Sequence, residues 1–352
     1  MKRYFSECRQ QNYGIVALIS VPLTILLAVI LSLALVFNLS PVAGTMLIRK
    51  LFDMPPQLPP DDLSFSEQVT VTNDISYGDA KEELLDLYLP KEADGVCPLI
   101  VWVHGGAFVG GDKRDVTHFA EALAYHGYAV AAINYTRAPE AKYPTPVLQT
   151  GEAYTFLTET YDAAAANIDT TRVFLAGDSA GAHIAAQFMI LQTNEAYRES
   201  FLAAHDAEAF PAPISKNVLK GALLYCGPYS VERMTSVTNP LMKFLVSQTG
   251  WAYFGSKSFG DTPAGKEANL VEHVTSAFPT SFITDGNILT FPDHAKELVE
   301  NLTAQGVPVQ TLFFDGELEI VEHEFQFDLK ENAGRLALEP TLEFLSKRLL
   351  FK

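Results

Sequence analysis

Short β-like runs alternate with helical patterns through most of the chain, and this alternation constrains the fold more than any other feature. The β-like runs, rich in Val, Ile, Leu, Ala and Phe, lie at 84–89, 99–104, 128–134, 172–177, 219–225, 281–284 and 309–314. Helical patterns lie at 116–126, 147–161, 180–191, 293–304 and 333–349. Strands that alternate with helices form a mostly parallel sheet with helices on both faces. The sequence therefore predicts an α/β fold.

The amino-acid composition indicates which kinds of binding partner do not suit this chain, because it fixes the net charge and the number of cysteines. A chain of 352 residues with 48% hydrophobic residues can fill a large core. The formal net charge of -17, from 42 acidic and 25 basic residues, repels the phosphates of nucleic acids, so we expect no nucleic-acid partner. The three cysteines are far apart and odd in number, which fits neither a disulfide framework nor a metal-ligand cluster. Phosphate-binding and dinucleotide-binding motifs are also missing, so we expect no metal and no cofactor.

A run without charged residues follows a basic tail at the N-terminus. Residues 14–37 read GIVALISVPLTILLAVILSLALVF, which is longer than the about 20 residues that a helix needs to cross a membrane. A cleaved signal peptide, the alternative, has an apolar region of about 7–15 residues. Lys2, Arg3 and Arg9 precede the run, and this bias favours a cytoplasmic N-terminus. We therefore expect a basic tail at 1–13 and a single-pass signal anchor at 14–37, with the remaining chain outside the cytoplasm.

Residues 38–64 differ in composition from the segments on either side. They contain Gly44 and five prolines (Pro41, Pro55, Pro56, Pro59 and Pro60), which is typical of an extended linker or collar rather than of a core element. One folded domain is then expected at 65–352. Within it, residues at about 228–278 lack clear β character and exceed the length of a plain crossover, which favours a cap over an active site.

The most specific motif is the sequence GDSAG at 177–181. It follows the apolar run 173–176 and begins a helical pattern, so Ser179 lies at a sharp turn from strand to helix. Such a turn holds a nucleophilic serine in a strained backbone conformation, and glycines two residues before and after let neighbouring backbones approach. The motif predicts that Ser179 is a nucleophile.

A second motif, HGGAF at 104–108, directly follows a β-like run. Acyl transfer requires backbone N–H donors aimed at the developing oxyanion, and glycine-rich loops expose such groups. We expect an oxyanion hole formed by Gly105, Gly106 and Ala180, the residue after the nucleophile. His104 is interpreted as a residue that braces this loop.

Three motifs in sequence order carry a resemblance to a known group: HGGAF at 104–108, YTRAPE at 135–140 and GDSAG at 177–181. They resemble the hormone-sensitive-lipase-like and feruloyl-esterase-like (BD-FAE-like) α/β hydrolases over about residues 83–350. The resemblance implies an α/β-hydrolase fold and a serine esterase. The stretch 137–140 is interpreted as a structural turn.

The catalytic base is expected near the C-terminus, because the triad of these enzymes runs Ser, acid, His along the chain. Of the eight histidines, His323 alone follows the last predicted strand, and the stretch 323–325 resembles the H-G-F turn of the family with Glu324 in place of glycine. His183 lies four positions after Ser179 and is interpreted as a residue packed on the same helix.

The acid departs from the family pattern, in which a G-x-x-D turn follows the penultimate strand. The aspartate position of that turn is Leu289 here. Asp285, at the end of the strand, is the favoured acid, and Asp293, at the start of the next helix, is the alternative. If neither aspartate is the triad acid, the enzyme works as a Ser–His dyad or uses Glu322 or Glu324 as the acid.

These residues predict a carboxylic ester hydrolase that uses Ser179, Asp285 and His323 and forms an acyl-enzyme. The expected substrate is a small-molecule ester, and the sequence does not indicate an oligomeric state. Two alternatives remain open: an amidase or peptidase with the same triad, and a non-catalytic surface-binding protein on a degenerate hydrolase fold.

Overall fold

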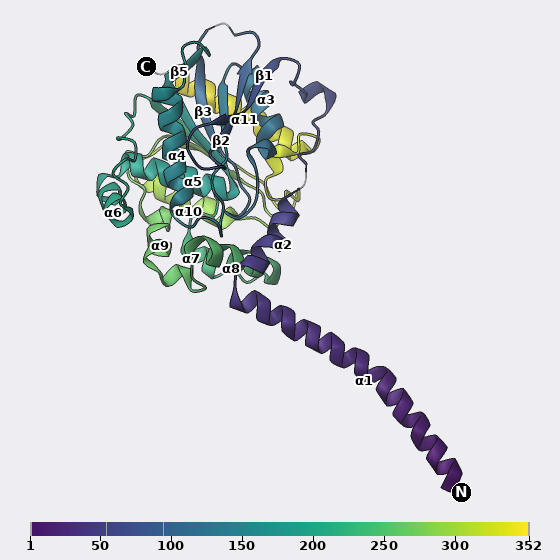
Figure 1. The fold of residues 1–352 in the computed structure, drawn as a ribbon. Coiled ribbons are helices and arrows are strands. Elements are labelled where there is room, and N and C mark those ends of the chain that lie inside the picture. Colours follow the sequence, from purple (N-terminus) through teal and green to yellow (C-terminus); the bar gives the residue numbers. More distant parts are fainter. Residues whose placement is uncertain (1, 54, 94, 351–352) are drawn as a thin grey trace.

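A single eight-stranded sheet organises the chain (Figure 1). The computed structural model describes residues 2–53, 55–93 and 95–350, with side chains described from Ser20 onward. The strands are β1 (Val69–Ser76), β2 (Leu84–Pro90), β3 (Cys97–Val103), β4 (Ala129–Ile133), β5 (Ile168–Asp178), β6 (Leu219–Tyr225), β7 (Ser281–Asp285) and β8 (Val309–Phe313). Their order is β1-β2-β4-β3-β5-β6-β7-β8. Strand β2 runs antiparallel to β1 and β4, and all other neighbours are parallel.

Helices cover both faces of this sheet, as the sequence predicted. Every residue of β3 is buried, as expected for a central strand covered on both sides. Trp102 of β3 packs on one face with α3 (Thr117–Tyr125) and α11 (Asn332–Leu350). The other face packs against α4 (Thr145–Thr155), α5 (Ser179–Thr193) and α10 (Pro292–Ala304). The predicted α/β class with a mostly parallel sheet is confirmed.

Further helices lie in the connections. Helix α6 (Glu195–His205) follows α5, and three helices lie between β6 and β7: α7 (Val231–Thr235), α8 (Pro240–Phe254) and α9 (Pro263–Glu267). Short turns of other helix types lie at 61–63, 113–116, 156–160, 259–261, 270–272 and 325–327. Figure 1 shows α7, α8 and α9 together at the end of the domain where the N-terminal helix meets it.

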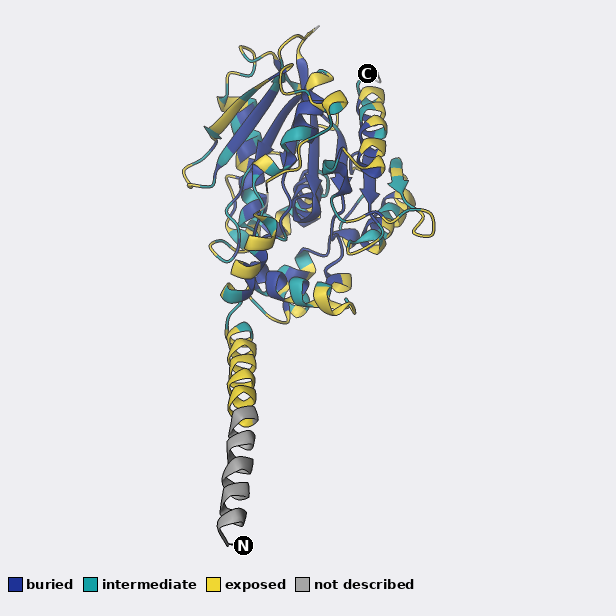
Figure 2. Ribbon diagram, turned by 90° about the vertical axis from the view of Figure 1, so that its right-hand side faces the viewer, coloured by how far each residue is buried: buried dark blue, intermediate teal, exposed yellow. Residues whose placement is uncertain are grey.

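The N-terminal helix α1 (Lys2–Leu39) projects away from the domain (Figures 1 and 2). Its stretch Ser20–Leu39 is long and apolar enough to cross a membrane, and none of its most apolar window is buried against protein. A cytosolic surface helix does not expose such a continuous apolar surface to water. The helix therefore has the properties of a membrane anchor or of a signal sequence.

The segment 38–64 corrects one expectation, because it is not an extended linker throughout. Helix α2 (Val42–Phe52) lies within it and packs on α8, with Ile48 fully buried in the domain core. Arg49 donates to the carbonyls of Val109 and Ala138, at 2.5 and 2.7 Å, and pairs with Glu140. The prolines on either side of α2 led to the prediction of a linker, whereas the residues between them form an amphipathic helix that belongs to the folded domain.

Candidate active site

Ser179 lies where β5 ends and α5 begins. Its φ of 49° is the left-handed conformation that a non-glycine residue adopts only under strain. A Cβ at Gly181 would lie 2.0 Å from the carbonyl oxygen of Val103, so only glycine permits this approach of α5 to β3. Ser179 is 6% exposed. The predicted strand-to-helix turn is present, with the strain and the close backbone approach that the motif requires.

His323 follows β8 and approaches the serine directly. Its Nε2 lies 2.8 Å from Ser179 Oγ. Desolvation lowers the pKa of His323 to about 4, so the ring is neutral near pH 7. A neutral imidazole at hydrogen-bond distance from a hydroxyl is able to accept its proton.

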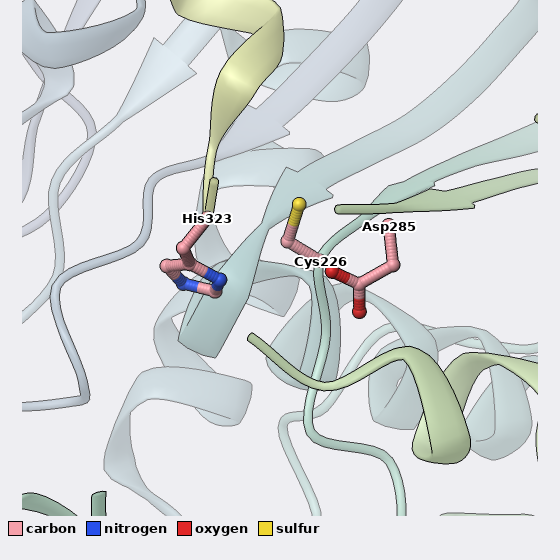
Figure 3. Close-up of side chains that lie close together, drawn as sticks. All are labelled: Cys226, Asp285 and His323. Atoms are coloured by element: carbon pink, nitrogen blue, oxygen red, sulfur yellow. The ribbon is translucent and has the colours of Figure 1, made fainter. Parts of the chain in front are cut away.

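Asp285 lies at the end of β7 and reaches His323 through a third side chain. The hydroxyl of Thr290 donates to Asp285 Oδ1, and Thr290 Oγ1 lies 2.7 Å from His323 Nδ1. Figure 3 shows the carboxyl group of Asp285 on one side of Cys226 and the His323 ring on the other. The structure thus joins Ser179, His323, Thr290 and Asp285 in one chain of hydrogen bonds. Sequence reasoning missed Thr290, for which no motif gave a signal.

The single proton of the Thr290 hydroxyl fixes the tautomer of the histidine. Because that proton goes to Asp285, Thr290 Oγ1 accepts from Nδ1–H of His323. Nε2 is then unprotonated and faces Ser179. Burial raises the pKa of Asp285 to about 7, against the effect of the Thr290 hydrogen bond. Its charge state therefore changes near neutral pH.

The other candidate acids lie differently. Asp293 is exposed in the first turn of α10, and Glu322 is exposed next to His323. Glu324 adopts a left-handed conformation with φ 57°, and its Oε1 lies 3.9 Å from His323 Nε2. That side of the ring faces Ser179, whereas a triad acid acts on Nδ1. Asp285 alone among these four residues is connected to Nδ1.

Glu324 instead forms a carboxyl pair with Asp178, in the strand-to-helix turn. A Cβ at Gly105 would lie 2.4 Å from an oxygen of each carboxyl group, so both converge on the glycine loop. Burial and the nearby Asp178 hold the pKa of Glu324 well above its usual range. Burial also raises the pKa of Asp178 to about 6. Glu324 is therefore a neutral acid that donates to Asp178.

The same geometry corrects one part of the predicted oxyanion hole. The N–H of Gly105 donates to Asp178 Oδ2 at 2.7 Å, so this donor is already used. Trp102 Nε1 donates to the other oxygen of Asp178, also at 2.7 Å. The prediction that Gly105 donates to the oxyanion is wrong in this structure. Gly106 and Ala180 remain as candidates, and Ala180 lies in the first turn of α5, where N–H groups lack partners within the helix.

His104 and the turn at 137–140 hold the glycine loop. His104 is buried, stacks on Tyr135 at a centroid distance of 4.5 Å, and its Nδ1 lies 2.6 Å from the carbonyl oxygen of Gly105. Desolvation lowers the pKa of His104 to about 4. Arg137 donates to the carbonyl of Gly111 at 2.6 Å. These contacts agree with the bracing roles expected from the sequence.

The side chains of Cys226, Asp285 and His323 lie close together (Figure 3). The thiol sulfur, one carboxylate oxygen and one ring nitrogen lie within 4.8 Å of one another. Cysteine binds metal as a thiolate, but burial and the nearby Asp285 hold the pKa of Cys226 well above its usual range. Both ring nitrogens of His323 already have hydrogen-bond partners. These residues therefore do not fit a metal site, and Cys226 is a buried thiol that packs beside the acid.

The sheet order, the strained serine at the turn after β5 and the histidine after β8 together define the class of the protein, an α/β hydrolase. The BD-FAE family model matches residues 85–298, which is more than half of the chain. The chain therefore belongs to the BD-FAE family, as the resemblance predicted.

Comparison with known structures supports the fold. The crystal structure of esterase B from Lactobacillus rhamnosis superposes with a TM-score of 0.69 at 19% identity, covering 87% of this chain and 93% of that chain. A thermostable carboxylesterase from a metagenomic library superposes with a TM-score of 0.64 at 20% identity, covering 89% and 99%. At these identities the similarity establishes the shared fold.

Curated relatives match over shorter regions. The chain is 36% identical to an isoprenylcysteine alpha-carbonyl methylesterase of Arabidopsis thaliana over 37% of this chain and 30% of that protein. It is 29% identical to kynurenine formamidase of Danio rerio over 48% of this chain and 50% of that protein. The chain thus spans half or less of the length of these two relatives.

Proposed function

We propose that the protein is a serine hydrolase of carboxylic esters with Ser179 as its nucleophile. The observation that carries this proposal is the 2.8 Å contact between Ser179 Oγ and His323 Nε2 at a strained strand-to-helix turn. Membership of a family with esterase relatives agrees with it. A binding protein has no need of a strained serine facing an unprotonated imidazole nitrogen.

The proposed reaction is acyl transfer in two steps. His323 takes the proton of Ser179, and Oγ attacks the ester carbonyl, with the N–H groups of Gly106 and Ala180 donating to the oxyanion. The imidazolium returns the proton to the departing alcohol. Water then attacks the acyl-enzyme by the same route and releases the acid. Asp285 stabilises the imidazolium through Thr290, with no cofactor in any step.

Active-site labelling tests this proposal. A fluorophosphonate probe is expected to label the full chain, and Ser179→Ala is expected to abolish both labelling and the hydrolysis of p-nitrophenyl esters. The variant removes only a hydroxyl, so its thermal midpoint is expected to stay unchanged. Labelling that survives in Ser179→Ala would overturn the assignment of the nucleophile.

Amide hydrolysis is a second candidate, since the relatives include a kynurenine formamidase. The same triad chemistry cleaves esters and amides. A panel of p-nitrophenyl esters and matched anilides separates the two, because an esterase turns over the esters far faster at equal acyl groups. A preference for anilides would favour the amidase.

We further propose that the chain is a single-pass membrane protein. Residues 1–13 are the basic tail and 14–37 the signal anchor, and residues 65–352 form, together with α2, the catalytic domain outside the cytoplasm, with a cap at about 228–278. The apolar stretch Ser20–Leu39 and its exposure support an anchor. The protein is expected to resist carbonate extraction and to keep its N-terminus, whereas a soluble chain beginning near residues 35–45 would identify a signal peptide.

A further inference from the structure

The domain contacts the last turns of the apolar helix itself. The ring of Phe244 in α8 packs edge-on against Phe37, with centroids 5.6 Å apart. Gln248 of the same helix donates to the carbonyl of Phe37 at 3.4 Å, and Lys257 donates to that of Asn38. Because these partners lie inside the stretch Ser20–Leu39, no spacer separates the domain from the proposed anchor.

The position of α8 relative to a membrane follows from these contacts. If Ser20–Leu39 fills the hydrocarbon layer, residues 37 and 38 lie at its boundary, and α8 lies at the level of the headgroups. Trp251 and Lys257 are close there, with the ammonium 4.6 Å from the ring centroid. Tryptophan and lysine are side chains typical of this boundary.

The surface around the base of α1 has the composition of a membrane-contacting face. Large apolar side chains are exposed on α2 and at the start of α8: Val42, Met46, Leu47, Leu51 and Leu241. Neither helix contains an acidic residue, in a chain that has 42 of them, and the charged residues of both helices are basic. We use the name basal face for the surface formed by α2 and by residues 240–247, which are the first half of α8. The basal face therefore carries no acidic side chain on these helices, although the chain as a whole is negatively charged.

The basal face is connected to the proposed catalytic histidine. The lining of a cavity of about 310 Å³ includes Met242 of α8 and Leu289, Thr290 and Phe291, beside polar and charged side chains that include Arg233 and Asp293. Thr290 hydrogen-bonds to His323, and Phe291 packs edge-on against its ring at 5.5 Å. Leu289 is 47% exposed at the rim. One side of this cavity is therefore formed by Met242 of the basal face, and the other by residues that contact His323.

We propose that the basal face rests on the lipid bilayer and that the substrate is an ester with a long apolar chain held in that bilayer. The proposal rests on the esterase function proposed above and adds the substrate class. We place the apolar part of the ester between the bilayer and the side of the cavity that Met242 and Leu289 form. The ester carbonyl thereby reaches Ser179 while the rest of the substrate remains near lipid.

The test uses the full chain in vesicles of ether-linked phosphatidylcholine, which has no ester bond to cleave. Two esters of one coumarin fluorophore serve as probes: the oleate, which partitions into the vesicle, and the acetate, which is soluble in water. The variant is Met46→Asp with Leu241→Asp, which places two charges on the basal face. The matched control is Val96→Asp with Leu336→Asp, two exposed apolar residues on other surfaces.

The basal variant is expected to lower oleate turnover about tenfold, because charges are costly against lipid, and to leave acetate turnover within about twofold. The control is expected to change neither rate, and vesicle flotation checks that all proteins remain inserted. Unchanged oleate turnover in the basal variant, or an equal loss on both esters, would overturn the proposal. If wild type cleaves neither ester and takes no fluorophosphonate, the esterase function fails, and this inference fails with it.

Discussion

The two sides of the site are built in opposite ways. The serine side is a single turn, residues 177–181, in which a strained φ and the contact of Gly181 with β3 hold Ser179. The acid side is assembled from β7, the loop that carries Thr290, and the turn that carries His323. A site that one turn holds in place is rigid, and it can be recognised from a local sequence motif. A site assembled from three segments depends on tertiary packing.

The strongest test of this comparison is Gly181→Ala. The added Cβ would meet the carbonyl oxygen of Val103 at 2.0 Å, so α5 has to move away from β3. We expect loss of fluorophosphonate labelling and a large fall in folded yield. Leu289→Ala changes an exposed residue in the loop of the acid side and serves as the control, which is expected to leave folding intact. Normal labelling of Gly181→Ala would show that the turn is not rigid.

Asp285→Asn is expected to have the next largest effect. A triad carboxylate orients its histidine and stabilises the cation, and its loss typically costs about 10⁴ in turnover. The thermal midpoint should change little, because the amide keeps the shape. Asp293→Asn is the control, since Asp293 is exposed. Equal effects of the two changes would break the assignment of the acid.

Thr290→Val tests whether the hydroxyl connects the acid to the base. Valine keeps the shape but cannot hydrogen-bond, so the tautomer of His323 is no longer fixed, and we expect a loss of about 10² in kcat. Thr290→Ser keeps the hydroxyl and should recover most of the activity with KM unchanged. Equal activity of the valine and serine variants would exclude this role for Thr290.

The pH dependence of activity distinguishes the acid from the base. The pKa of His323 is lowered to about 4, whereas that of Asp285 is raised to about 7. Protonated Asp285 carries no negative charge to stabilise the imidazolium, so kcat/KM should fall as pH decreases through about 7. We expect a tenfold decrease per pH unit below that value. A profile flat down to about pH 5 would show that the charge of Asp285 is not required.

The smallest effect concerns stability on the serine side. A carboxyl group with a raised pKa in the folded state contributes stability at low pH, and this contribution is lost as pH rises through that pKa. The pKa of Asp178 is raised to about 6, and burial and the nearby Asp178 hold the pKa of Glu324 well above its usual range, so the thermal midpoint should fall as pH rises from about 5 to 8. Glu324→Gln donates to Asp178 without a titrating proton and should reduce this fall by about 2–4 °C. Glu322→Gln, at an exposed neighbour, should not.

Local sequence patterns determined much of this molecule. The seven predicted strands all lie in the sheet as β2 to β8. The central parallel strands β3 to β6 are mostly buried, so each contains an apolar run that can be recognised in the sequence. Ser179 could be located because a strand-to-helix turn with two close backbone approaches admits few residue types. His323 could be located because it alone among the histidines follows the last strand.

Other features were decided only by tertiary structure. Strand β1 is an exposed edge strand with few buried residues, so its pattern was too weak to predict. Helix α2 lies between prolines, and its buried side is defined by α8, which is distant in sequence. The link through Thr290 and the use of the Gly105 N–H by Asp178 both join segments that no local pattern relates. Hydrogen bonds between distant segments depend on where the packed core places each backbone, and that placement is a property of the whole fold.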